Sequence, residues 1–267
     1  VRPDEMHQSF DFAFLECSWD ATDLRAAIEG SLAAADSVGA PTTWVLSNHD
    51  VVRHVSRLGL PVGTPRPHGI GPGDPQPDEV LGLRRGRAAT TLMLGLPGSA
   101  YLYQGEELGL LEVCDLPDEV RQDPAWFRSN HAEVGRDGCR VPIPWVHDAP
   151  HYGFGPGRPW LPQPESFARY AVDVQDGVEG STLELYRTLL RLRRELRLGR
   201  GSLTPVTGFG PEVIAYAVHA PGHPRVVIVL NLGEDAVTLP PGADILVASG
   251  DLDGGQVPQD TAVWATW

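Results

Sequence analysis

The sequence predicts an α/β fold followed by a small antiparallel β-sandwich, and two observations support this prediction. Over the first 199 residues, short apolar strand segments alternate with helical segments, an order typical of parallel strands joined by crossover helices. From residue 200 onward, short apolar runs are separated only by turn residues, as in a small sandwich. We therefore expect two domains, residues 1–199 and residues 200–267.

The elements of the first domain follow from hydrophobic spacing. The Phe-rich run over residues 6–15 predicts a buried strand, and Asp20 can cap the helix expected from residue 21 to about 35. Residues 104–179 are rich in Gly, Pro and Asp and are expected to form one long loop. The same spacing predicts strands over 43–46 and 100–103 and helices over 81–94 and 183–198.

The second domain is expected to consist of short strands separated by Gly- and Pro-rich turns. We expect these strands over residues 213–219, 225–231, 236–239, 245–248 and 262–267.

The composition excludes several classes of partner. The chain has 21 basic and 35 acidic residues, for a formal net charge of -14, which disfavours nucleic acid or an anionic membrane and suits a neutral substrate. The 3 cysteines form no CxxC pair, so neither a disulfide framework nor a zinc site is indicated. No metal or cofactor is expected. With no apolar membrane span and no leader sequence visible, a cytoplasmic location is the expectation.

A polar cluster, Ser47-Asn48-His49-Asp50, follows the expected strand over 43–46. In a parallel α/β barrel the residues that follow a strand lie at the active-site face. A carboxylate and an imidazole at this position can bind vicinal sugar hydroxyls as acceptor and donor. The alternative, a turn capped by Asn and Asp, is left open by the pattern alone.

Three ordered segments resemble motifs of the alpha-amylase superfamily, glycoside hydrolase family 13. Residues 47–50 (SNHD) resemble its NHD motif. Residues 96–109 (LPGSAYLYQGEELG) resemble the segment that ends its eighth barrel strand. Residues 135–145 (GRDGCRVPIPW) resemble the R-D-N-x-R-T-P-M-x-W segment of its oligosaccharide-cleaving members.

The resemblance implies a partial (β/α)8 TIM barrel, about strands 6 to 8, and a retaining α-glucosidase acting on α-linked gluco-oligosaccharides. Asp50 would be the catalytic carboxylate that stabilises the transition state by gripping ring hydroxyls. His49 would bind a neighbouring hydroxyl, and Arg140 would help to fix the non-reducing end of the substrate. Asn48 and Arg53 are further candidates for substrate binding.

The resemblance also implies that the chain is incomplete as a catalyst. In this superfamily the nucleophile and the acid/base end barrel strands four and five, and no G-F-R-x-D segment occurs in the sequence. We therefore expect a C-terminal fragment that is inactive alone and whose partner is the missing N-terminal half of the barrel.

Two alternatives remain open for the function. One is a fragment of a trehalose- or sucrose-type transglucosylase, which uses the same scaffold. The other is a non-catalytic carbohydrate-binding protein. A third reading of His49-Asp50, as the metal-binding HD pair of a phosphohydrolase, is disfavoured because the pair follows a strand and not a helix.

Overall fold

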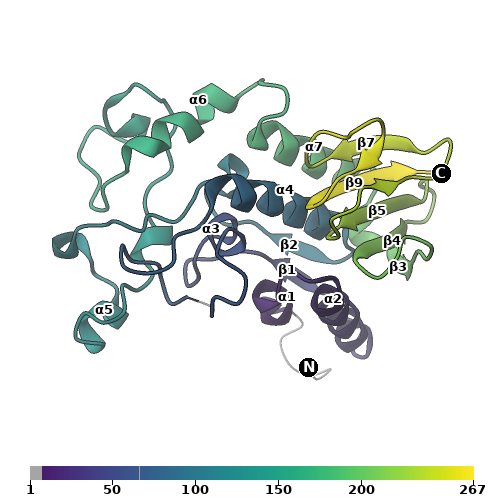
Figure 1. The fold of residues 1–267 in the computed structure, drawn as a ribbon, viewed down its shortest axis with the longest axis horizontal. Helices are drawn as coiled ribbons and strands as arrows, with labels where there is room; N and C mark the ends of the chain where they lie inside the picture. The colour runs from purple at the N-terminus through teal and green to yellow at the C-terminus, as the bar shows by residue number, and fades with distance from the viewer. Residues whose placement is uncertain (1–7, 66) are drawn as a thin grey trace. The chain divides into compact units, whose positions relative to one another are not determined.

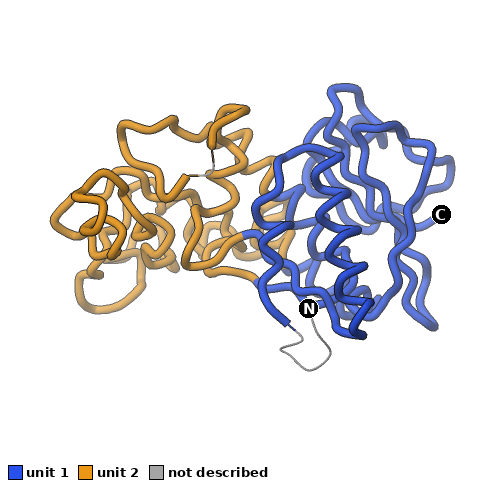
Figure 2. The backbone as a smooth tube through the Cα atoms, turned by 90° about the horizontal axis from the view of Figure 1, so that it is seen from below, with its two compact units in different colours: residues 1–46, 87–101, 187–267 blue, residues 47–86, 102–186 orange. Residues whose placement is uncertain are grey.

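The computed structural model describes residues 8–65 and 67–267, and Figure 1 shows their helices and strands. Contacts group the chain into two compact units, coloured separately in Figure 2. Unit 1 contains residues up to 46, 87–101 and 187–267, and unit 2 contains residues 47–86 and 102–186. The expected domains, 1–199 and 200–267, stay a prediction, because grouping by contacts does not test which segments fold independently.

Unit 1 contains the parallel strands that the sequence predicts. Strands β1 (Thr43–Val45) and β2 (Ser99–Tyr101) pair in parallel, and helix α4 (Glu79–Gly95) lies between them in the chain. Trp44 is fully buried, and its Nε1 donates a hydrogen bond to the Pro97 carbonyl at 2.6 Å. The pair is a piece of a parallel α/β fold.

The expected strand over residues 6–15 is wrong for residues 8–15, none of which lies in a strand, and residues 6 and 7 lie outside the described residues. Helix α1 (Phe12–Glu16) is capped by Asp11, whose side chain accepts a hydrogen bond from the Phe14 amide at 3.1 Å. Phe14 and Leu15 are buried, whereas Phe12 is exposed. A short apolar run does not distinguish a strand from a buried helical turn, and here the Asp11 cap favours the helix.

The two other long helices appear where the helical repeat predicts them. Helix α2 (Ala21–Asp36) is capped by Asp20, whose side chain accepts the amide of Thr22 at 2.8 Å. Helix α7 (Thr182–Glu195) begins in unit 2 and ends in unit 1. A short helical turn, η6 (Leu198–Arg200), leads from it into the C-terminal strands.

The C-terminal strands form an antiparallel sheet, all within unit 1. All five expected strands are present, and β3 and β8 were not predicted. The main sheet has the order β3 (Ser202–Pro205), β4 (Val213–His219), β5 (Val226–Asn231), β9 (Thr261–Thr266), β7 (Asp244–Ala248), and β6 (Val237–Thr238) pairs separately with β8 (Gln256–Val257).

Both faces of the main sheet are covered. On one face, alternate residues of β4, β5 and β9 form an apolar cluster with Leu239 and Val257. Leu239 directly follows β6, and Val257 belongs to β8, so the small β6–β8 ladder covers this face. On the other face, the Trp264 Nε1 donates to the Thr91 carbonyl of α4 at 2.8 Å. The small ladder and α4 thus bury the sheet on both sides, which explains why β4 and β5 are apolar at nearly every position.

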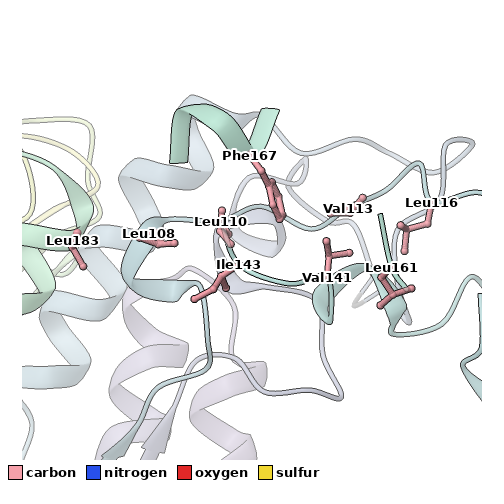
Figure 3. Packing of buried hydrophobic residues seen from close by; sticks show 9 residues of the cluster. All are labelled: Leu108, Leu110, Val113, Leu116, Val141, Ile143, Leu161, Phe167 and Leu183. Atoms are coloured by element: carbon pink, nitrogen blue, oxygen red, sulfur yellow. The ribbon is translucent and has the colours of Figure 1, made fainter. Parts of the chain in front are cut away.

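Unit 2 consists mainly of the long connections that follow β1 and β2. Its regular elements are α3 (His54–Leu58), η1 (Glu106–Leu108), η2 (Asp118–Val120), α5 (Pro124–Arg128), η3 (Asp137–Cys139), η4 (Pro150–Gly153), η5 (Glu165–Tyr170) and α6 (Val172–Gln175). Apolar residues of the loops, of η1 and η5, and of the start of α7 form a core, shown in Figure 3: Leu108, Leu110, Val113, Leu116, Val141, Ile143, Leu161, Phe167 and Leu183.

Candidate functional site

The turn after β1 presents the predicted polar cluster. Asn48 is buried, and its Oδ1 accepts a hydrogen bond from the Asp50 amide at 2.8 Å, which caps the turn. The side chains of His49 and Asp50 are exposed, at 64% and 45%. The capped turn and the functional interpretation are therefore compatible, because the cap fixes the backbone from which Asp50 projects.

Two arginines converge on one oxygen of Asp50. Arg136 Nη1 donates to Oδ1 at 2.5 Å, and Arg140 Nη2 donates to the same oxygen at 3.3 Å. Arg140 Nε also donates to the His49 carbonyl at 2.9 Å. The second carboxylate oxygen, Oδ2, lies 3.4 Å from His49 Nε2. Asp50 thus has one oxygen held by cations and a second oxygen toward the exposed imidazole.

A buried carboxylate, Asp123, holds Arg136 in place. Arg136 Nε and Nη2 donate to its two oxygens at 2.5 and 3.1 Å, a bidentate pair. Asp123 also caps helix α5 by accepting the Ala125 amide at 2.8 Å. Burial alone would raise the pKa of Asp123, but the hydrogen bonds from Arg136 and from the amides of Ala125 and Arg136 hold that pKa well below its usual range. Arg136 is therefore fixed between two carboxylates, Asp123 and Asp50.

Asp137 anchors the loop that carries this pair. It is buried, and its Oδ2 accepts the backbone amides of Gln122 and Asp123 at 2.7 and 2.9 Å. Arg140 Nη1 lies 3.6 Å from Asp123 Oδ2, so both arginines share the Asp123 carboxylate. The segment 136–140 and the start of α5 are thereby locked together by charge-assisted hydrogen bonds.

Arg53 is placed differently from the other predicted residues. Its side chain is only 1% exposed, and its Nη1 and Nη2 donate to the carbonyls of Gln104 and Cys139 at 2.5 and 2.9 Å. Its guanidinium carbon lies 5.4 Å from the centre of the Tyr103 ring. The buried Arg53 side chain therefore links the loop at Gln104 to the loop at Cys139. It does not reach the surface on which the side chains of His49 and Asp50 are exposed.

Buried ionisable groups lie near Arg53, and burial shifts their pKa values toward the neutral form. Burial raises the pKa of Glu106 to about 8 and that of Glu112 to about 7, although the Arg53 amide donates to Glu112 Oε2 at 3.1 Å. Burial lowers the pKa of His54 to about 3, so its imidazole is neutral and Nδ1 lies 2.9 Å from the Ser47 hydroxyl.

The structure thus brings together Asn48, His49, Asp50 and Arg140, and it sets Arg53 apart. Sequence reasoning missed Arg136 and Asp123. Arg136 lies inside the segment GRDGCRVPIPW that suggested Arg140, and Asp123 stands before Pro124, an Asp-Pro start signal for a helix. The motif and the Asp-Pro pair could each have drawn attention to one of these residues. Neither signal indicates that Arg136 and Asp123 are hydrogen-bonded to each other.

The described residues contain neither a metal-binding cluster nor a membrane-spanning helix. Among residues 8–65 and 67–267, no group of three or more His, Cys, Asp or Glu side chains could hold a metal ion. None of the helices described in those residues is long and apolar enough to cross a bilayer.

The charged cluster follows a parallel strand, and α/β-barrel enzymes carry their active sites at this position, at the carboxyl ends of the strands. Residues 4–200 match the family model "Alpha amylase, catalytic domain". The chain therefore belongs to the alpha-amylase family, and its fold is a partial TIM barrel followed by an antiparallel sheet.

Curated relatives agree with this assignment. The chain is 34% identical over 196 residues to a probable alpha-glucosidase of Rhizobium meliloti (strain 1021), covering 73% of this chain and 32% of that protein. It is 28% identical over 244 residues to an alpha-glucosidase of Candida albicans, covering 81% of this chain and 40% of that protein. The chain thus spans well under half the length of these relatives.

Solved structures extend the likeness to the whole chain. The alpha-glucosyl transfer enzyme XgtA superposes with a TM-score of 0.73 at 30% identity, covering 98% of this chain and 46% of that one. The trehalose-6-phosphate hydrolase of Bacillus licheniformis superposes with a TM-score of 0.75 at 20% identity, covering 99% of this chain and 52% of that one, which is a likeness of fold.

Proposed function

We propose that this chain supplies the sugar-gripping part of a retaining α-glucosidase that removes terminal glucosyl residues from short α-linked oligosaccharides. The observation that carries the proposal is the arrangement of Asp50, whose Oδ1 is held by Arg136 and Arg140 while its Oδ2 faces the exposed His49. The names of the curated relatives, alpha-glucosidase in both cases, support the choice of reaction.

In this proposal Asp50 accepts hydrogen bonds from ring hydroxyls of the glucosyl residue at the cleaved bond. Such bonds strengthen as positive charge develops on the ring toward the oxocarbenium-like transition state, so they contribute to rate more than to ground-state affinity. The two arginines keep the carboxylate oriented, which reduces the reorganisation needed during the reaction. His49 offers a second hydrogen-bonding group for a neighbouring hydroxyl.

The other predicted site residues have different proposed roles, either in contacting the substrate or in positioning the groups that contact it. Arg140 lies at the exposed edge of the site, 28% exposed, and we assign it a contact with the non-reducing end of the substrate. Asn48 acts as a positioning residue through its cap on the Asp50 amide. Arg53, first expected to bind substrate, is better assigned as a positioning residue, because its side chain is buried and bonded to two loop carbonyls.

We further propose that the bond-cleaving nucleophile and acid/base lie outside these 267 residues. On this assignment β1 and β2 are the seventh and eighth barrel strands, and the rest of the barrel completes the pocket. The isolated chain would then bind sugar weakly and would not cleave it. No disulfide joins Cys17, Cys114 or Cys139 in the described residues, which supports a reducing, cytoplasmic location.

The test is made in the full-length gene product that contains this chain. Asp50→Ala is expected to lower kcat/KM for p-nitrophenyl α-glucoside on the order of 10³-fold. Its melting temperature should change little, because Asp50 is an exposed side chain. Asp251→Ala, an exposed aspartate in the C-terminal region, is the matched control and should retain full activity.

Two further measurements bear on the proposal. Proton NMR of the first-formed glucose should show the α-anomer, since a retaining enzyme preserves the configuration. An Asp50→Ala variant with undiminished kcat/KM would contradict the role of Asp50. Turnover by residues 1–267 alone would contradict the location of the cleaving carboxylates.

A second candidate is glucosyl transfer to a sugar acceptor, because the structure that matches 98% of the chain at 30% identity is an alpha-glucosyl transfer enzyme. Product analysis with maltose, sucrose and trehalose separates the two. Free glucose as the main product supports hydrolysis, and new disaccharides support transfer. Sugar binding without either product would indicate a non-catalytic binding protein.

A further inference from the structure

A polar cavity lies in unit 2, and the residues that line it are different from those that hold Asp50. Its volume is about 440 Å³, within the range of small-molecule sites in proteins. The cavity is lined by His147, Asp148, Ala149, His151, Tyr152, Arg158, Pro159, Pro162 and Gln163.

The polar groups of this cavity match those of the Asp50 site in kind. A carboxylate (Asp148), an imidazole (His147) and a guanidinium (Arg158) line it together, as Asp50, His49 and Arg140 come together after β1. A carboxylate accepts hydrogen bonds and a guanidinium donates them, so the set suits vicinal hydroxyls, each of which is both donor and acceptor. Opposite charges within the lining favour a neutral ligand over an ion.

His147 is held in one orientation. Its Nδ1 lies 2.8 Å from Asp173 Oδ2, and its backbone amide donates to Asp173 Oδ1 at 3.0 Å. The hydrogen bond to Asp173 raises the pKa of His147. The ring is therefore fixed by one nitrogen, and Nε2 is its second hydrogen-bonding atom.

Apolar groups contribute to the cavity and to the chain around it. Tyr152 and two prolines belong to its lining. Trp145, Phe154 and Trp160, in the same stretch of the chain, are exposed at 47%, 51% and 56%. A pyranose ring has apolar faces and a polar edge, and aromatic rings pack against such faces while charged groups bond the edge.

The backbone at the cavity is held in an unfavourable conformation. His151 and Tyr152 both have positive φ values, 52° and 49°, and Gly153 follows at 71°. Two successive left-handed residues other than glycine cost free energy, and strain of this type gathers at ligand sites. The turn is retained because the Tyr152 carbonyl accepts the amides of Trp145 and Val146 at 2.8 and 3.0 Å.

We propose that the cavity formed by His147, Asp148, Tyr152 and Arg158 is a second carbohydrate site, which binds one neutral pyranose unit of an α-linked oligosaccharide. The inference rests on the proposed function only for the choice of an α-linked sugar. The site needs no bond-cleaving group, because its role is to hold substrate near the molecule.

The test counts binding sites in the full-length gene product by equilibrium dialysis with a radiolabelled, thio-linked maltoside, which the enzyme does not cleave. Wild type is expected to bind two equivalents. The double variant Asp148→Ala/Arg158→Ala should lose one of them, with affinity at that site reduced at least about tenfold. Arg128→Ala, an exposed arginine outside the cavity, is the control and should keep both.

Arg140→Ala separates the two proposals, because Arg140 is the residue assigned to hold the non-reducing end of the bound substrate. This variant should weaken the other equivalent and leave the site at Arg158 intact. One equivalent in wild type that Arg140→Ala weakens would overturn the second site and leave the first standing. Two equivalents unaffected by the Asp148/Arg158 variant would also overturn it. Two equivalents unaffected by Arg140→Ala would contradict the assigned role of Arg140 in the proposed function instead.

Discussion

The two units of the molecule hold their backbones by different means. In unit 1, strands β4, β5 and β9 pair edge to edge and are buried on both faces by apolar side chains. In unit 2, buried arginines replace strand pairing: Arg53 bonds the carbonyls of Gln104 and Cys139, and Arg121 bonds those of Leu116 and Val134. The fold of unit 1 thus depends on strand pairing and apolar periodicity, whereas unit 2 joins its loops through an apolar core and through arginine-to-carbonyl hydrogen bonds.

The largest effect is expected from removing Arg53. Arg53→Met keeps an apolar stem but deletes the donors to two loop carbonyls and the cation near Glu112, so we expect a loss of about 3 kcal/mol in the free energy of unfolding. Urea denaturation of the full-length protein measures it. Arg128→Met, on the exposed end of α5, should stay within about 0.5 kcal/mol of wild type. Equal effects at both positions would mean that the hydrogen bonds of Arg53 to the two loop carbonyls do not hold unit 2 together.

A smaller loss is expected from overpacking unit 1. A Cβ at Gly95 would lie 2.9 Å from Trp264 Nε1 and 2.8 Å from Ile228 Cγ1, so Gly95→Ala should cost about 1–3 kcal/mol. Gly30→Ala is the control, because a Cβ there meets nothing within 4 Å. In helix α2 that change should stabilise by about 0.5–1 kcal/mol. Thermal melts of both variants give the comparison, and a neutral Gly95→Ala would mean that the sheet and α4 are loosely packed.

The smallest expected effect depends on pH. Burial raises the pKa of Glu106 to about 8, so the folded state keeps a proton that the unfolded state releases near its ordinary value of 4.5. The contribution of Glu106 to stability is therefore fully present below about pH 4.5 and declines as pH rises through about 8. Glutamine mimics the protonated carboxyl, so Glu106→Gln should gain at least about 1 kcal/mol relative to wild type between pH 5 and pH 9.

Melting curves across this pH range test the assignment. Glu119→Gln, at an exposed position, should show no such gain. A Glu106→Gln difference that is constant with pH would show that the carboxyl of Glu106 is not kept protonated by burial.

The sequence predicted the regular parts of unit 1 because apolar repeats encode them directly. Helices α2, α4 and α7 and strands β4, β5 and β9 follow apolar patterns, whereas β3 is short and largely exposed and β8 has only two residues, so both escaped notice. The run over 6–15 misled because a short apolar run fits a strand or a helical turn equally, and the Asp11 cap decides between them.

The site was predicted only as far as its motifs extend. His49, Asp50 and Arg140 followed from resemblance, but no local pattern shows that Asp123 holds Arg136. Arg53 carries the same signal as an exposed arginine, and its burial follows from carbonyls 51 and 86 residues further along the chain. Contacts between loops of this kind depend on tertiary structure, which periodicity does not encode.

The chain crosses between the units at residues 46/47, 86/87, 101/102 and 186/187. Unit 2 is therefore two inserts, residues 47–86 and 102–186, each beginning shortly after a strand of unit 1 and returning within a helix of it. No single cut of the polypeptide releases unit 2 as one piece. The chain returns to unit 1 at residues 86/87, within α4, and at residues 186/187, within α7. Loops from a relative could therefore be joined at these two points. Such an exchange would alter unit 2 and leave the sequence of β1, β2 and the C-terminal sheet unchanged.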